Sequence, residues 1–244
     1  MNKKQLTHNQ KIDFYLEGLN KGLANSLLLY GQAGCGKSTA IMNFMDRHGY
    51  SSGEQYKYLQ NYTTPIQLFK KLKEVNGLKN PKILILDDIE DALKNTQIIG
   101  ILKGACWGVG KNNERIVCWN SSSLKDEAKQ FVFKGKVIII VNAINTNNPL
   151  IQALVDRGFY YGITFTKQQT TDLILENAKL PYQKINYQSR MMIANFLISQ
   201  QYNIQNLSLR LLSKAYNLFL LSPSHWQQLL KECFVNQGKG SELL

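Results

Sequence analysis

A glycine-rich segment near the N-terminus has the residue types and the spacing of a phosphate-binding loop. It fits the pattern G-x-x-x-x-G-K-[ST] at each fixed position, between an apolar run and a segment of helical character. Glycines let backbone N–H groups turn toward phosphate oxygens, and a helix N-terminus adds a favourable dipole. Lys37 would reach the β- and γ-phosphates of ATP, while the Ser38 hydroxyl would bind Mg²⁺. The residues expected to hold ATP are Gly31, Gln32, Ala33, Gly34, Cys35, Gly36, Lys37, Ser38 and Thr39.

A site for ATP and Mg²⁺ also needs a carboxylate on the metal side, and two adjacent aspartates follow an apolar run. A buried strand is expected at Lys82–Leu86, and Asp87 and Asp88 come directly after it. Asp87 would hold Mg²⁺ through water, and Asp88 would orient or deprotonate the water that attacks the γ-phosphate. The alternative is that both acids only cap the turn that follows. Their position at the end of a buried strand favours the site.

Strand and helix patterns alternate through the first two thirds of the chain. Strands are expected at Ser26–Tyr30, Tyr56–Gln60, Lys82–Leu86, Val137–Val141 and Tyr160–Phe165. Helices are expected at Lys11–Leu23, Ser38–Arg47, Pro65–Val75, Thr96–Trp107 and Pro149–Val155. Such alternation is typical of a parallel sheet covered by helices. Residues 1–166 are therefore predicted to form an α/β nucleotide-binding domain.

The pattern changes after Phe165, where helical periodicity continues without strands. Helices are expected at Lys167–Ala178, Asn186–Gln200, Leu207–Leu221 and Ser224–Val235. Thr166 and Ser222-Pro223 are helix-start signals that support these positions. Residues 167–236 are therefore predicted to form a small all-helical domain, and residues 237–244 a tail.

The composition favours an intracellular protein with phosphate-bearing partners. Lysine and arginine outnumber aspartate and glutamate by 29 to 17, a formal net charge of +12. Such an excess favours nucleic acid, although a generally lysine-rich composition would produce the same charge. The apolar runs are too short to cross a bilayer and no leader pattern is found, so a cytoplasmic location without membrane contact is expected. Four cysteines lack the spacing of a zinc site and are expected to be reduced thiols: Cys35, Cys106, Cys118 and Cys233.

Together these patterns resemble the AAA+ ATPases, a class of P-loop NTPases, over nearly the whole chain up to about Val235. The family implies a five-stranded parallel sheet followed by a helical lid domain. Asn142, at the tip of the Val137–Val141 strand, matches the sensor 1 residue that positions the attacking water. Arg157 matches the arginine finger that reaches the ATP of the next subunit, and Arg210 matches the sensor 2 arginine of the lid. The alternatives are an asparagine that ends a strand in a turn and two surface arginines.

The chain departs from the family pattern at one position of the predicted site. Most AAA+ proteins have glutamate after the metal-site aspartate, where this chain has Asp88. The shorter side chain would set the carboxylate back by about 1–1.5 Å, and such displacements can cost much rate. Either the loop compensates, hydrolysis is slow, or Glu90 or Asp91 contributes.

Two short strand patterns, at Arg115–Asn120 and Gln130–Phe133, precede the sensor 1 strand. Some AAA+ motors that act on nucleic acid insert a β-hairpin there, so the segment 115–136 is predicted to be one; the alternative is that both strands extend the sheet. Lysines attract phosphates, and an aromatic ring can stack on bases. The residues expected to contact nucleic acid are Trp119, Lys125, Lys129, Lys134 and Lys136. The run FVFKGKVIIIVN also resembles ATPases of phages, plasmids and other mobile elements, for which the location would be the host cytoplasm.

Three functions fit these patterns. In the first, the chain forms a homo-oligomeric ring, for instance a hexamer, that remodels single-stranded or duplex DNA in replication. It would act as a helicase, a helicase loader or a transposition regulator, with a replication protein as partner. The second function is an AAA+ motor that remodels proteins, although Asn61–Thr64 has the aromatic residue of such a motor's loop without its glycine. The third is a monomeric P-loop switch or small kinase, which would need neither Arg157 nor four C-terminal helices.

Other residues with chemical potential are assigned to packing or to the surface. A nuclease or polymerase would need acidic or histidine clusters beside the ATP site, and the three histidines are scattered along the chain: His8, His48 and His225. Trp107 and Trp226 are likewise expected to pack in the core.

Overall fold

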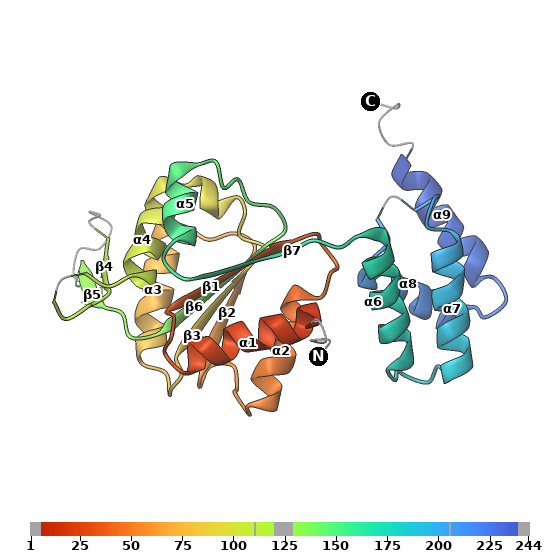
Figure 1. The fold of residues 1–244 in the computed structure, drawn as a ribbon, viewed down its shortest axis with the longest axis horizontal. Coiled ribbons are helices and arrows are strands. Elements are labelled where there is room, and N and C mark those ends of the chain that lie inside the picture. The colour runs from red at the N-terminus through yellow and green to blue at the C-terminus, as the bar shows by residue number, and fades with distance from the viewer. Residues whose placement is uncertain (1–5, 110, 120–128, 205, 239–244) are drawn as a thin grey trace, which may run out of the picture. The chain divides into compact units, whose positions relative to one another are not determined.

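The computed structural model describes residues 6–109, 111–119, 129–204 and 206–238, which form two compact units (Figure 1). The first unit comprises Met1–Gln32 and Lys37–Ile163, and the second comprises Thr164–Leu244 together with Ala33–Gly36. The domain limits expected from the sequence, 1–166 and 167–236, remain predictions. In the described parts of the chain, no helix is long and apolar enough to cross a membrane.

Five parallel strands form the centre of the first unit, in the order β2-β3-β6-β1-β7. The strands are β1 (Ser26–Gly31), β2 (Tyr56–Gln60), β3 (Ile83–Asp87), β6 (Lys136–Val141) and β7 (Phe159–Ile163). Every residue of β3 is buried, as is every residue of β6 after the first. Strands covered on both faces read as continuous apolar runs, which is why the sequence predicts them so clearly. The predicted five-stranded parallel α/β sheet is confirmed.

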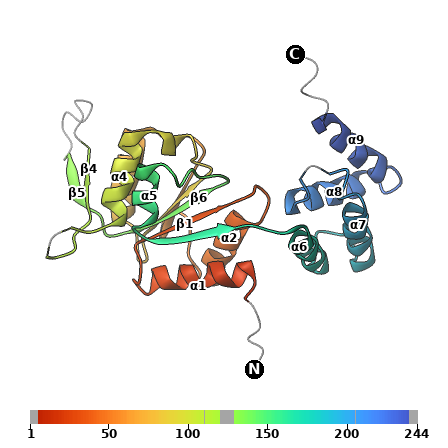
Figure 2. The same cartoon turned by 45° about the horizontal axis from the view of Figure 1, so that its top comes forward.

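Helices cover both faces of this sheet. They are α1 (His8–Asn20), α2 (Lys37–Arg47), α3 (Pro65–Asn76), α4 (Thr96–Cys106) and α5 (Pro149–Val155), with a short 3₁₀ helix at Ala92–Lys94. Helices α1 and α2 lie together on one face, and α3, α4 and α5 lie on the other (Figures 1 and 2). Between successive strands of the main sheet, the chain therefore crosses over through at least one helix.

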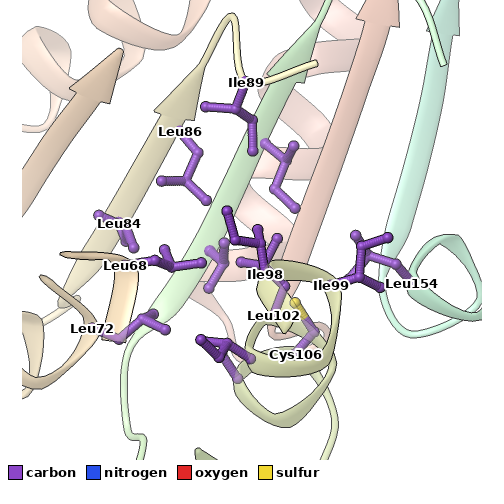
Figure 3. Packing of buried hydrophobic residues seen from close by; sticks show 14 of the residues in the cluster. Leu68, Leu72, Leu84, Leu86, Ile89, Ile98, Ile99, Leu102, Cys106 and Leu154 are labelled. Carbon is purple, nitrogen blue, oxygen red and sulfur yellow. The ribbon is translucent and has the colours of Figure 1, made fainter. Parts of the chain in front are cut away.

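The core under α3 and α4 holds β3 in place. Leu84 and Leu86 of β3 belong to one buried cluster with Leu68 of α3 and Leu102 of α4 (Figure 3). All four side chains have 0% exposure. Full burial of a leucine stabilises a fold by about 1.5–3 kcal/mol. The strand that ends in Asp87 is therefore among the most firmly held parts of the first unit.

The first helix begins three residues earlier than the apolar pattern predicts. Thr7 accepts a hydrogen bond from the backbone N–H of Gln10, and the Gln10 side chain accepts one from the Thr7 N–H. This capping box starts the helix at His8 instead of Lys11. The helix also ends before Gly22, which has a φ of +73° and so lies outside helical geometry.

Two short strands, β4 (Ile116–Cys118) and β5 (Gln130–Val132), pair antiparallel as a separate sheet, here called the ribbon. The alternative that these strands extend the main sheet is wrong. The Asn76 side chain at the end of α3 donates to the Val132 carbonyl (2.7 Å). Arg115 donates to the carbonyls of Ala105 (3.0 Å) and Gly135 (2.6 Å). The ribbon is thereby anchored at the C-terminal ends of α3 and α4; residues 120–128 of the predicted hairpin lie outside the described residues.

The described residues of the second unit form helices α6 (Lys167–Lys179), α7 (Tyr187–Ser199), α8 (Leu209–Leu221) and α9 (Trp226–Gly238). They enclose an apolar core of their own, to which Ile193, Leu197, Trp226 and Leu230 contribute. Helix α9 runs to Gly238, so the expected tail from residue 237 begins inside a helix. The all-helical character predicted for this part holds in its described residues.

Candidate nucleotide-binding site

Three neighbouring strands end at one edge of the main sheet, and each end carries a residue predicted for the site. Strand β1 leads through Gly31 into the glycine-rich loop, β3 ends in Asp87, and Asn142 directly follows β6. In the register, Asp87 lies beside Ile140, two residues before Asn142. The carboxyl edge of a parallel sheet is the usual place for a ligand in α/β folds. Strand order thus brings together residues that are far apart in the sequence.

Lys37 is the first residue of α2, and only 5% of it is exposed. Its ammonium group donates to the carbonyls of Gly31 (2.5 Å) and Gln32 (3.2 Å), and to Asn142 Oδ1 (3.1 Å). A buried ammonium is stable only when acceptors surround it. These acceptors hold the charge at the mouth of the loop, where phosphate oxygens can take their place.

The loop itself connects β1 to α2 as the pattern predicts. Gly36, directly before the helix, has a φ of +88°, a left-handed conformation that favours glycine. The loop residues Ala33 and Cys35 are half-buried, while Gln32 and Thr39 are exposed. Helix α2 begins at Lys37, directly after the loop, so the free N–H groups of its first turn lie next to the loop. An anion site at a helix N-terminus requires this arrangement.

The oxygens expected to bind Mg²⁺ lie side by side. The Ser38 hydroxyl donates to Asp87 Oδ2 at 2.6 Å, and Asp87 is 3% exposed. Hydroxyl and carboxylate oxygens are the hard ligands that Mg²⁺ prefers. Among the described residues, no group of three or more His, Cys, Asp or Glu could hold a metal by itself. Ser38 and Asp87 therefore fit a Mg²⁺ ion that also binds nucleotide phosphates and water.

A residue that sequence reasoning missed, Tyr58 of β2, donates its hydroxyl to the same oxygen, Asp87 Oδ2. Burial and then the hydrogen bond to Asp87 raise the pKa of Tyr58 above its ordinary value. The phenol therefore keeps its proton at neutral pH and acts as a donor. The only sequence signal is its place in a strand two residues before the strand's end, which does not reveal the register with β3.

The side chain of Asn142 forms hydrogen bonds with both Lys37 and Asp88. Its side-chain Nδ2 donates to Asp88 Oδ1 at 2.8 Å, while its Oδ1 accepts from Lys37. The Asn142 backbone N–H donates to a carboxylate oxygen of Glu90. Asp88 has a φ of +53°, which aspartate tolerates better than most residues. The turn after β3 thus aims Asp88 at Asn142 instead of leaving it as a simple cap.

The two acids suggested as substitutes for a glutamate have different surroundings. Glu90 is half-buried and anchors the backbone of Asn142. Asp91 points away: its side chain is 85% exposed and pairs with Lys94 at 2.6 Å. The suggestion that Asp91 contributes to the site is therefore wrong, whereas Glu90 touches it through Asn142.

Replacing Asp88 by asparagine should slow ATP turnover by about 10²–10⁴-fold, the usual contribution of a positioned base, and leave ATP binding unchanged. The amide matches the carboxylate in shape but cannot accept a proton from water. Turnover would be followed by phosphate release and ATP binding by calorimetry. Asp91→Asn is the matched control and should be active. An active Asp88→Asn variant beside an inactive Glu90→Gln variant would move the base to Glu90.

Arg157 lies far from this edge within its own chain. It follows α5, is half-buried and donates its Nε to the Ala153 carbonyl at 2.8 Å. A Cβ on the next residue, Gly158, would overlap with the Ser26 hydroxyl, so this turn packs tightly on the start of β1. Gly31, at the other end of β1, is five residues away, about 16 Å along an extended strand. The structure therefore separates Arg157 from the glycine-rich loop of its own chain.

The residues predicted to contact nucleic acid, and the predicted sensor 2 arginine, lie in different parts of the structure. Lys129 and Lys134 are exposed at the ribbon, while Lys125 lies outside the described residues. Lys136 belongs to β6 and donates to the Ala24 carbonyl (3.4 Å) and to Asn25 Oδ1 (3.3 Å), so its placement on the hairpin is wrong. Trp119 is half-buried against the apolar core, which favours packing over base stacking. Arg210 is exposed in the first turn of α8, and its sensor 2 role remains a prediction.

The chain has the fold of the AAA+ ATPases, a class of P-loop NTPases, and the resemblance drawn from the sequence is confirmed at this level. No protein-family model matches the sequence. An uncharacterized 36.7 kDa protein of Enterobacteria phage T4, encoded in the nrdC-mobD intergenic region, is similar to it. The two are 22% identical over 229 aligned positions, and the match covers 87% of this chain and 69% of the phage protein.

Solved structures resemble the chain at low sequence identity. Cdc6p from Pyrobaculum aerophilum aligns with a TM-score of 0.52 and 16% identity, over 95% of this chain and 65% of Cdc6p. The chain thus spans slightly less than two thirds of the length of that protein. Domain III of the replication initiation protein DnaA from Thermotoga maritima aligns with a TM-score of 0.48 and 17% identity, over 88% of this chain and 85% of the domain.

Proposed function

We propose that the chain is an ATPase that binds ATP with Mg²⁺ at the carboxyl edge of its main sheet. The observation that carries this proposal is the polar network that joins Lys37 to Asn142 and Asn142 to Asp88, beside the Ser38–Asp87 pair. It offers a cation for the phosphates, two oxygens for the metal and a carboxylate with an amide for water. Mg²⁺ bound there would neutralise phosphate charge.

In this proposal the protein contributes position and charge. Lys37 exchanges its carbonyl acceptors for phosphate oxygens, and Ser38 and Asp87 hold the metal. Asn142 keeps the Asp88 carboxylate directed at the space in front of the loop, where the attacking water would be held. Asp88 then accepts the proton of that water. Positioning and electrostatic stabilisation account for most of the catalysis in phosphoryl transfer.

The position of Arg157 supports a homo-oligomer, for instance a hexameric ring. The start of β1 is at the opposite end of the strand from the loop, so the guanidinium can serve an ATP site only on another subunit. A cation supplied in this way stabilises charge on the transferred phosphoryl group. A monomeric switch would not need an arginine here for its own ATP site.

We further propose that the substrate is DNA and that the process is replication. The net charge of +12 attracts phosphates, and the ribbon stands apart from the main sheet with Lys129 and Lys134 exposed. Whether the motor acts as a helicase or as a helicase loader depends on a partner. A protein substrate is the second candidate, because Tyr62, in the loop after β2, is 74% exposed.

The test is ATP hydrolysis with and without single-stranded DNA, duplex DNA or an unfolded polypeptide, at fixed low salt. We expect DNA to stimulate turnover, and Lys129→Glu with Lys134→Glu to remove that stimulation and flatten the salt dependence of DNA binding by about one unit of slope per lost phosphate contact. Basal hydrolysis should not change, because neither lysine is near the nucleotide site.

The control is the pair Lys79→Glu and Lys94→Glu, which makes the same charge change at two exposed lysines elsewhere on the first unit. An unchanged salt slope in the ribbon variant would remove the ribbon from the DNA interface. Stimulation by polypeptide and not by DNA would favour a protein-remodelling motor.

A further inference from the structure

Tyr58 reaches the metal-side carboxylate from a neighbouring strand. It is the third residue of β2 and pairs with Ile85 of β3, two residues before Asp87. Side chains two residues apart on a strand point to the same face of the sheet. Tyr58 and Asp87 therefore share a face as diagonal neighbours, a separation that an aromatic side chain can span.

The hydroxyl of Tyr58 completes the surroundings of one carboxylate oxygen. Asp87 Oδ2 accepts from Ser38 on α2 and from Tyr58 on β2. A carboxylate oxygen accepts about two hydrogen bonds, so two hydroxyl groups from different elements satisfy it. Because Asp87 is 3% exposed, bulk water cannot readily replace a lost donor.

We propose that Tyr58 is a positioning residue for the metal site, which sets the orientation of the Asp87 carboxylate toward the Mg²⁺ of bound ATP. In this proposal the Ser38 hydroxyl oxygen also binds the metal. The Tyr58 hydroxyl does not bind the metal, so it can hold Asp87 in the absence and in the presence of nucleotide. Partners of this kind orient metal ligands and tune metal affinity. The inference rests on the proposed function of the site.

The chain offers a matched control on the same strand. Tyr56 lies two residues before Tyr58, shares its face of the sheet and is 6% exposed. It pairs with Ile83, four residues before Asp87, about 13 Å along the strand. Tyr56→Phe therefore removes a buried hydroxyl from β2 without touching the metal site.

The experiment measures binding of a non-hydrolysable ATP analogue by calorimetry, over a range of Mg²⁺ concentrations and in EDTA. Mg²⁺ should increase the affinity for the analogue, and Tyr58→Phe should raise the Mg²⁺ concentration at which half of this increase is reached by about 10–100-fold. Loss of a hydrogen-bond partner of a metal ligand has an effect of this size on metal affinity. Binding in EDTA should stay at the wild-type value, which also shows that the variant is folded. Tyr56→Phe should follow the wild type throughout.

A double substitution tests whether Tyr58 acts through Asp87. In an Asp87→Asn background, Tyr58→Phe should cause no further loss of Mg²⁺ dependence. The inference would be overturned if the Tyr58→Phe variant required the same Mg²⁺ concentration as the wild type. It would also be overturned if Tyr58→Phe weakened the Mg²⁺ dependence as much in the Asp87→Asn background as in the wild type. If the wild type itself binds the analogue without any dependence on Mg²⁺, the proposed function fails instead, so the two failures are distinguishable.

Discussion

Replacing Lys37 by alanine should abolish ATP binding. The ammonium is a buried cation of the loop, and it donates to the carbonyls of Gly31 and Gln32 and to Asn142 Oδ1. Hydrogen bonds to charged groups contribute about 1.5–3 kcal/mol each, so losing two phosphate contacts should weaken binding at least about 100-fold. Calorimetry with ATP and Mg²⁺ measures this directly.

The control is Lys94→Ala, which removes an exposed lysine paired only at the surface with Asp91. Circular dichroism of both variants should match the wild type, because neither lysine belongs to the buried apolar cluster that holds the main sheet and its helices together. Tight ATP binding by Lys37→Ala would show that the glycine-rich loop is not the nucleotide site.

Replacing Arg157 by alanine should lower turnover by about 10³-fold or more, while ATP affinity stays at the wild-type value. The reason is geometric: the residue lies by the start of β1 and cannot reach the loop at the other end of that strand. Turnover per subunit of the wild type should accordingly rise with protein concentration. Phosphate release at several concentrations, together with calorimetry, checks both statements.

Mixing two inactive variants gives the sharper test of a shared site. A Lys37→Ala subunit keeps its arginine, and an Arg157→Ala subunit keeps its loop, so a mixture rebuilds complete sites at some interfaces. Partial recovery of turnover is expected. Arg47→Ala, at an exposed arginine paired with Asp13, is the control and should be fully active. Normal hydrolysis by Arg157→Ala alone, or no recovery in the mixture, would contradict a site completed by a second subunit.

The order of elements follows from local patterns, with small errors at the ends. Apolar runs predict β3 and β6, because strands covered on both faces need apolar side chains throughout. The start of α1 was predicted three residues late because the capping hydrogen bonds of Thr7 and Gln10 precede the apolar pattern. The ribbon was one of two alternatives, since short strands carry no local sign of which strand they pair with.

The residues of the candidate site also fall into those that the sequence predicted and those whose contacts only the structure shows. Lys37, Ser38, Asp87 and Asn142 were predicted because each lies where a motif or a strand end places it. The contact of Glu90 with the Asn142 backbone, the turning away of Asp91 and the position of Lys136 in β6 were not predicted. Each depends on where a side chain points after the turn, and turn geometry involves partners from other strands.

The sequence by itself determined the alternation of strands and helices, the glycine-rich loop between β1 and α2, and the acids at the end of β3. These features are local: a period of apolar residues, a run of glycines and the end of a strand follow from neighbours along the chain. Only the tertiary structure decided that Tyr58 shares Asp87 with Ser38, that the ribbon is separate from the main sheet, and that Arg157 lies at the far end of β1. Those facts depend on strand order and register, which are settled by packing between segments distant in the sequence.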